Sequence, residues 1–138
     1  MAFIKLQADR IFDGYRFHED KVLVLQRDGT VETIACANEA GDDVQKMPGI
    51  LSPGFVNCHC HLELSHLKNH IDENTGLAAF VRQVVQKRNV AESLISQAIK
   101  DADEEMNQNG IFAVGDICNT TDTLSQKIKS SLYYHNFI

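Results

Sequence analysis

Two histidines separated by a single residue are the clearest candidates for chemistry in this sequence. They lie in residues 53–66, which read PGFVNCHCHLELSH and contain His59 and His61. On a β-strand, residues two apart project to the same face about 6–7 Å apart, so both imidazoles can reach one ion. Neutral imidazole binds zinc and iron(II) alike. Because a catalytic metal usually takes three or more protein ligands and leaves a position for water, this pair would be half of a site.

Other interpretations of the same region stay open. Strand alternation turns Cys58 and Cys60 to the opposite face as small buried hydrophobes packed against helices, which argues against a four-ligand Cys/His zinc site. His66 and His70 are four residues apart and could form an all-histidine zinc site, but the polar sequence around Lys68 is typical of a mobile loop. Two histidines that are merely packed or solvated at a strand end are the simplest alternative.

The elements that must position these residues change in character near residue 52. Residues 1–52 contain short β-branched runs separated by Asp-Gly, which is the pattern of antiparallel hairpins. Two Pro-Gly steps follow within residues 48–54, where a chain changes direction between units. Beyond them the sequence predicts, in order, a strand, two helices, a strand, a short helix and a strand. These elements are expected at residues 54–61, 77–88, 89–109, 111–117, 121–129 and 132–138. This order indicates a parallel α/β architecture.

The two long predicted helices each carry one apolar face at helical spacing. At the start of the second helix, Asn89 is followed three residues later by Glu92, a variant of the capping box. At its end, Asn109 and Gly110 are typical of a helix C-terminus at which the chain leaves through a residue with left-handed backbone conformation.

Composition narrows the class of protein. The chain has 138 residues, of which 43% are hydrophobic and 23% charged, as in a soluble globular domain. Thirteen basic and 19 acidic side chains give a net charge of -6, which disfavours nucleic acid as a partner. No apolar run approaches the roughly 18 residues that span a membrane, and the N-terminus lacks a signal pattern. Four irregularly spaced cysteines favour reduced thiols, so we expect a cytoplasmic protein.

The segment Ile50–Glu63 resembles the first barrel strand of the amidohydrolase superfamily, in particular its cytosine deaminase, chlorohydrolase and aminodeoxyfutalosine deaminase-like branch. Residues 8–34 are similar to the small β-sandwich of that family, residues 110–117 to its second barrel strand and residues 133–138 to its third. The resemblance implies an α/β fold: the N-terminal part of a (β/α)8 barrel, incomplete here, after a β-sandwich portion. It divides the chain into residues 1–52 and 53–138.

The resemblance also implies roles for individual residues. His59 and His61 match the metal-binding histidines of the first strand. Glu63, just beyond them at the mouth of the strand, matches a substrate-binding or supporting position, with a solvated loop carboxylate as the alternative. Asp116 lies near the end of a strand, where barrel active sites form, but its glycine context favours a structural role such as a hydrogen bond to a neighbouring loop.

A complete barrel needs about 250 residues, so the later ligands and the general acid–base groups are expected beyond Ile138. The chain alone should contain no complete catalytic site and be inactive. For the parent protein, the resemblance implies a zinc or iron(II) ion that activates water for hydrolytic deamination, or related C–N or C–Cl cleavage, of a small heterocyclic substrate. An open strand at residues 132–138 predicts a homo-oligomer that covers it. A stand-alone half-barrel module for binding or assembly, without catalysis, is the alternative, and a non-hydrolytic relative is a third reading.

Overall fold

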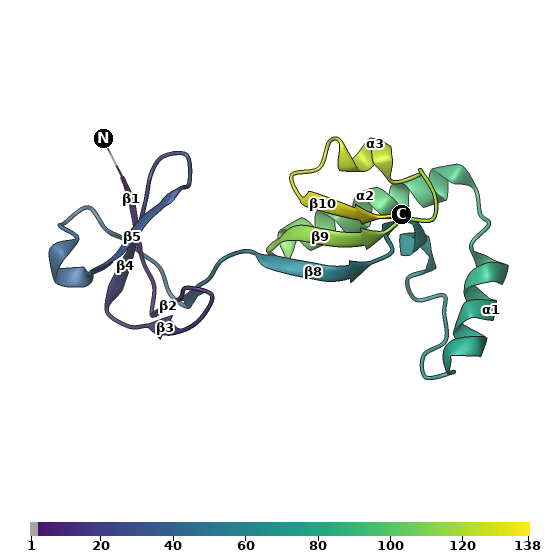
Figure 1. Ribbon diagram of the computed structural model, residues 1–138, viewed down its shortest axis with the longest axis horizontal. Helices are drawn as coiled ribbons and strands as arrows, with labels where there is room; N and C mark the ends of the chain where they lie inside the picture. The colour runs from purple at the N-terminus through teal and green to yellow at the C-terminus, as the bar shows by residue number, and fades with distance from the viewer. Residues whose placement is uncertain (1–2) are drawn as a thin grey trace. The chain divides into compact units, whose positions relative to one another are not determined.

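The computed structural model describes residues 3–138, and its chain divides into two compact units, Met1–Pro53 and Gly54–Ile138. Figure 1 shows the helices and strands of both units. The first unit contains β1 (Ile4–Gln7), β2 (Arg10–Phe12), β3 (Phe17–His18), β4 (Lys21–Leu25), β5 (Val31–Cys36), the 3-10 helix η1 (Ala37–Glu39), β6 (Gln45–Lys46) and β7 (Ile50–Leu51).

The strands of this unit form two small sheets, with the orders β5-β4-β1-β6 and β3-β2-β7. Antiparallel pairing of β4 with β5 and of β2 with β3 confirms the hairpins predicted at the Asp-Gly steps. β1 and β6, and likewise β2 and β7, pair in parallel, which local sequence did not predict. Val22, Val24 and Ala40 form the buried core, because alternate residues of β4 face inward.

Asp13 closes the hairpin between β2 and β3. Its Oδ1 accepts hydrogen bonds from the backbone N–H groups of Tyr15 and Arg16, each at 2.8 Å. Its Oδ2 lies 2.7 Å from Nε2 of His18, which must donate because an ionised carboxylate can only accept. The His18 bond first, and then the two backbone bonds, hold the pKa of the Asp13 carboxyl well below its usual range.

This lowered pKa predicts a pH-dependent contribution to stability. A carboxyl with a depressed folded-state pKa stabilises the fold above its unfolded pKa of about 3.9, and that contribution is lost as the pH falls further. We therefore expect the difference in unfolding free energy between the unsubstituted chain and Asp13→Asn to shrink as the pH falls from about 6 to about 3. Urea unfolding followed by circular dichroism measures both proteins. A gap that does not change with pH would contradict the prediction.

The second unit has the predicted order of elements. It contains β8 (Phe55–Cys60), the 3-10 helix η2 (Leu62–Leu67), α1 (Leu77–Lys87), α2 (Glu92–Gln108), β9 (Ile111–Ile117), α3 (Leu124–Lys127) and β10 (Tyr133–Phe137). Its sheet has the order β10-β9-β8 with parallel pairing throughout, which confirms a parallel α/β arrangement. α2 packs on one face of this sheet, where Ile99 of the helix and Val114 of β9 are both buried (Figure 1).

The loop predicted around Lys68 contains turns and bends but no helix or strand. The residues just before it form η2, which packs against α2. One local prediction in this unit needs correction. The capping box is wrong: Ala91 is the N-cap of α2, with no side-chain hydrogen bond, and Glu92 is already the first helical residue. Asn89 therefore lies too far upstream to cap the first free N–H groups.

α1 stands apart from the sheet in Figure 1, and it buries none of its side chains among the residues that the structure describes. Its predicted apolar face is present but exposed, as Leu77, Phe80, Val81 and Val85 show. No helix within residues 3–138 is both long and apolar enough to cross a membrane.

Candidate metal-binding site

An extra residue in β8 shapes the region around the two histidines. Asn57 pairs with Val114 and Cys60 with Asp116, so β8 advances three residues while β9 advances two. One inserted residue of this kind is a β-bulge, which re-aims the side chains around it. Gly115 of β9 lies opposite the bulge, and a Cβ at this position would be only 3.2 Å from the carbonyl oxygen of Cys58. The absence of a side chain at Gly115 therefore lets the backbone of β8 come close.

The bulge overturns the prediction that both cysteines of this strand share a buried face. Cys58 is exposed, whereas Cys60 is half-buried beside Asp116. Regular alternation would have placed them together, and it fails because the strand is irregular between them. Burial first, and then the neighbouring Asp116 charge, raise the pKa of the Cys60 thiol to about 12, so it is protonated at neutral pH.

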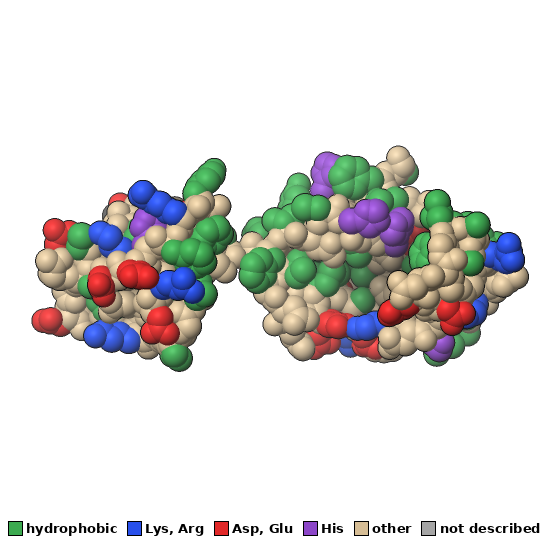
Figure 2. Space-filling view, turned by 90° about the horizontal axis from the view of Figure 1, so that it is seen from below, with side chains coloured by type: hydrophobic (Ala, Val, Ile, Leu, Met, Phe, Trp, Pro, Cys, Tyr) green, Lys and Arg blue, Asp and Glu red, His purple; other side chains and the backbone are tan. Residues whose placement is uncertain are grey.

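The structure brings the rings of His59 and His61 together. Their centroids are 5.2 Å apart and their planes are inclined by 63°. Two imidazoles bound to one zinc ion at about 2.0–2.1 Å and a tetrahedral angle would have centroids about 5 Å apart, and the observed separation of the rings matches that value. Nδ1 of His61 is also buried without a hydrogen-bond partner, which is unusual for a buried nitrogen. Figure 2 shows histidine side chains at the surface of this unit, bordered by hydrophobic ones.

Among the described residues, no third ligand lies close to this pair. Within residues 3–138, no group of three or more His, Cys, Asp or Glu side chains is placed to hold an ion. Nε2 of His66 lies 3.1 Å from the carbonyl oxygen of Arg88, and His70 is exposed, so the alternative all-histidine site is not formed.

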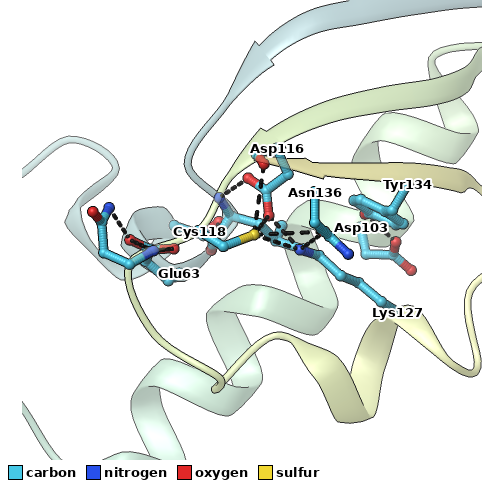
Figure 3. Close-up of polar contacts among 10 residues, drawn as sticks. Glu63, Asp103, Asp116, Cys118, Lys127, Tyr134 and Asn136 are labelled. Carbon is cyan, nitrogen blue, oxygen red and sulfur yellow. Dashed lines mark hydrogen bonds and ion pairs between the residues drawn. The ribbon is translucent and has the colours of Figure 1, made fainter. Parts of the chain in front are cut away.

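Glu63 is buried, with only 2% of its surface exposed. Both of its carboxylate oxygens accept from the backbone N–H of Asn119 at 3.2 Å, and Oε1 accepts from the side-chain amide at 2.7 Å. The alternative of a solvated loop carboxylate is therefore wrong. These bonds join the turn after β8 to the loop after β9 (Figure 3).

Asp116 has the structural role that the sequence suggested. It is 0% exposed, and its Oδ1 accepts from the backbone N–H of Leu62 at 2.9 Å, a bond to the neighbouring loop. Its Oδ2 forms an ion pair with Lys127 at 2.5 Å. Burial alone would lower the pKa of Lys127, but hydrogen bonds to Asp116 and Cys118 outweigh it and raise that pKa.

Sequence reasoning missed Lys127 and Asn119, the partners of the two buried carboxylates. Both lie in the segment between β9 and β10, 11 and 56 residues from the groups that they bind. No local pattern distinguishes a lysine that will be buried from a solvated one, so the sequence carried no signal for either.

Comparison with known proteins gives matches only among solved structures. No family model matches the chain, and no curated protein does so. Aminofutalosine deaminase from Helicobacter pylori, in complex with methylthio-coformycin, aligns over 98% of this chain with a TM-score of 0.77 and 20% identity. Guanine deaminase from C. acetobutylicum, with bound guanine, aligns over 98% with a TM-score of 0.73 and 15% identity. Atrazine chlorohydrolase from Arthrobacter aurescens, complexed with zinc, aligns over 96% with a TM-score of 0.66 and 16% identity.

These three enzymes are members of the amidohydrolase superfamily. The chain shares the fold of the part of these enzymes with which it aligns. The resemblance found in the sequence is thus confirmed at the level of the fold. The chain spans about a third of the length of the matched structures, namely 35%, 36% and 35% of their chains in the order given above.

Proposed function

We propose that this chain is the N-terminal part of a metal-dependent amidohydrolase. In this proposal β8, β9 and β10 are the first strands of the (β/α)8 barrel, and residues 1–52 belong to a β-sandwich domain. The observation that carries the proposal is the pair formed by His59 and His61, whose ring centroids are 5.2 Å apart at the end of a parallel strand. Active sites of α/β barrels form at this carboxyl end of the strands.

The proposed reaction of the whole protein is hydrolytic deamination, or related C–N or C–Cl cleavage, of a small heterocyclic substrate. The two deaminases and the chlorohydrolase among the matched structures support this class. A zinc or iron(II) ion, held in part by His59 and His61, would supply Lewis acidity and a water nucleophile at neutral pH. Glu63 is the proposed substrate-binding residue, with Asn119 orienting its carboxylate. The other ligands and the acid–base groups are proposed to lie outside this chain, which alone is inactive.

Metal binding by the chain tests this proposal. We expect substoichiometric zinc or iron(II) that a chelator removes easily, because two protein ligands hold an ion weakly. Zinc binding measured by isothermal titration calorimetry should be lost in His59→Ala and kept in His70→Ala, the matched control at an exposed histidine. One tightly bound ion per chain, lost in His59→Ala, would instead show a complete site and contradict the half-site.

The second candidate is a half-barrel module that binds or assembles without catalysis. It is favoured by large apolar side chains left exposed on the outer strands of the sheet, as at Phe55, Val56, Tyr133 and Phe137. Reading the coding sequence downstream of Ile138 separates the two: continuation into further strands with ligand residues supports the enzyme, and a stop codon supports the module. In either case we propose that the free chain forms homo-oligomers that cover this surface, which sedimentation analysis measures. A cytoplasmic location is also proposed, supported by four free cysteines.

A further inference from the structure

We propose that Asp116 is a positioning residue for His61, acting through the backbone N–H of Leu62, with Lys127 as its buried counter-ion. The inference rests on the proposed metal-binding role of the histidine pair and adds the groups that hold one of its members in place. Side chains that support metal ligands commonly contribute 10–100-fold to metal affinity, even though they do not touch the ion.

His61 is not held by the β-ladder. β8 ends at Cys60, and His61 is the N-cap of η2, with φ -131° and ψ 73° and no side-chain capping bond. The peptide unit that follows it is instead bonded at both ends. The carbonyl of His61 accepts from the N–H of Leu64 at 2.9 Å, and the N–H of Leu62 donates to Oδ1 of Asp116 at 2.9 Å. Because a peptide unit is planar, the two bonds together fix the backbone from which the His61 ring projects.

The carboxylate of Asp116 is in turn oriented from its other side. Lys127 of α3, whose side chain is only 6% exposed, pairs with Oδ2 and also donates to Oδ1 of Asn136 at 2.7 Å (Figure 3). Asn136 lies opposite Asp116 in the pairing of β10 with β9. One ammonium group therefore connects two strand ends to α3 and leaves the remaining oxygen of Asp116 aimed at the turn after β8. A buried charge of this kind requires such a partner.

A third buried carboxylate in this unit bonds to the helices but not to the turn after β8. Asp103 of α2 accepts from Gln126 at 2.9 Å, from Ser130 at 2.7 Å and from Tyr134 at 2.6 Å. These bonds join α2 to α3 and β10, and none of them reaches the turn after β8. Asp103 thus provides a matched control: it is buried in the same unit and well bonded, but it is not connected to His61.

Two double variants isolate the hydrogen bond to Leu62. Asp116→Asn/Lys127→Met and Asp116→Leu/Lys127→Met both remove the two charges together, so neither leaves an unpaired buried charge. Asparagine keeps a side-chain carbonyl that can accept from the Leu62 N–H, whereas leucine is similar in size and accepts nothing. We expect the zinc affinity of the Asn variant to stay within about threefold of the parent chain, and that of the Leu variant to fall about 10–100-fold.

Calorimetric titration with Zn²⁺ measures these affinities at a temperature where circular dichroism shows every protein folded. Subtracting the binding that remains in His59→Ala/His61→Ala isolates the histidine-dependent part. Hydrogen exchange of the Leu62 amide should be faster in the Leu variant than in the Asn variant. Asp103→Asn should lower the melting temperature and leave zinc affinity within about threefold. If the Leu variant does not fold, Asp116→Ala/Lys127→Met replaces it with the same expectation.

Three results of these measurements would overturn the positioning role of Asp116. Equal zinc affinity in the Asn and Leu variants, with histidine-dependent binding present, would overturn the positioning role and leave the proposed function standing. A loss in Asp103→Asn as large as that in the Leu variant would overturn it too, because general destabilisation would then explain both. Absence of histidine-dependent binding in the parent chain would overturn the proposed metal site, and the positioning role with it.

Discussion

Replacing Lys127 by methionine should lower the free energy of unfolding of the second unit, residues 54–138, by about 3–5 kcal/mol. Lys127 is the ion-pair partner of Asp116, whose side chain is fully buried. Methionine fills a similar volume, so the main consequence is a carboxylate without its counter-ion in a site that water does not reach. Urea unfolding of both proteins at neutral pH, followed by circular dichroism, measures the loss.

The matched control is Lys68→Met in the same unit. Lys68 also pairs with a carboxylate, that of Glu105 at 2.6 Å, but both side chains are more than half exposed, at 62% and 55%. Exposed ion pairs of this kind contribute about 0–1 kcal/mol. We expect at least a threefold larger loss for Lys127→Met than for Lys68→Met. Equal losses would mean that the charge of Asp116 is solvated in solution.

The double variant Asp116→Leu/Lys127→Met gives a further check, because replacing both members of a buried pair by apolar residues is often neutral or stabilising. It should unfold closer to the parent chain than Lys127→Met does. That outcome would assign the cost of the single substitution to the unpaired charge rather than to lost packing of the lysine stem.

The helices and strands of the second unit could be predicted because the sequence patterns that indicate them are local. The apolar face that begins at Leu77 repeats at helical spacing, and α1 begins at that residue. The Asn109-Gly110 exit was likewise informative, since α2 ends at Gln108 and Gly110 has φ 75°. What periodicity cannot give is the depth of burial, which depends on what covers each face. The apolar face of α1 is an example, because the pattern predicted it and the structure leaves it exposed.

The candidate site was predictable only in part. The spacing and sequence context of His59 and His61 identified a pair whose rings the structure places together. The bulge between Asn57 and Cys60 was not predictable, because it depends on the close approach of β8 to Gly115 on another strand. Similarly, the bonds that hold the turn after β8 come from side chains distant in sequence, and only the folded chain shows which polar residues become buried.

Packing between α2 and the sheet supports a second large effect. Ile99 is 1% exposed, whereas Leu94 on the same helix is 60% exposed. Truncating a buried isoleucine to alanine removes its transfer free energy and leaves a cavity, so Ile99→Ala should cost about 2–5 kcal/mol of unfolding free energy. Leu94→Ala should change stability by less than about 0.5 kcal/mol, because surface substitutions away from special features rarely do more.

Comparing Ile99→Ala with Leu94→Ala also tests whether this unit, which exposes much apolar surface, has a single well-packed structure. Alanine has the higher helix propensity, which favours the variants by a few tenths of a kcal/mol at both positions, so propensity cannot produce a loss at Ile99 alone. If α2 were only loosely collapsed onto the sheet, the cavity would be filled by rearrangement and both substitutions would have similarly small effects. Urea unfolding of the two variants distinguishes these cases. A loss confined to Ile99→Ala would establish a fixed contact between α2 and the sheet that carries Asp116, which is the rigidity that positioning of His61 requires.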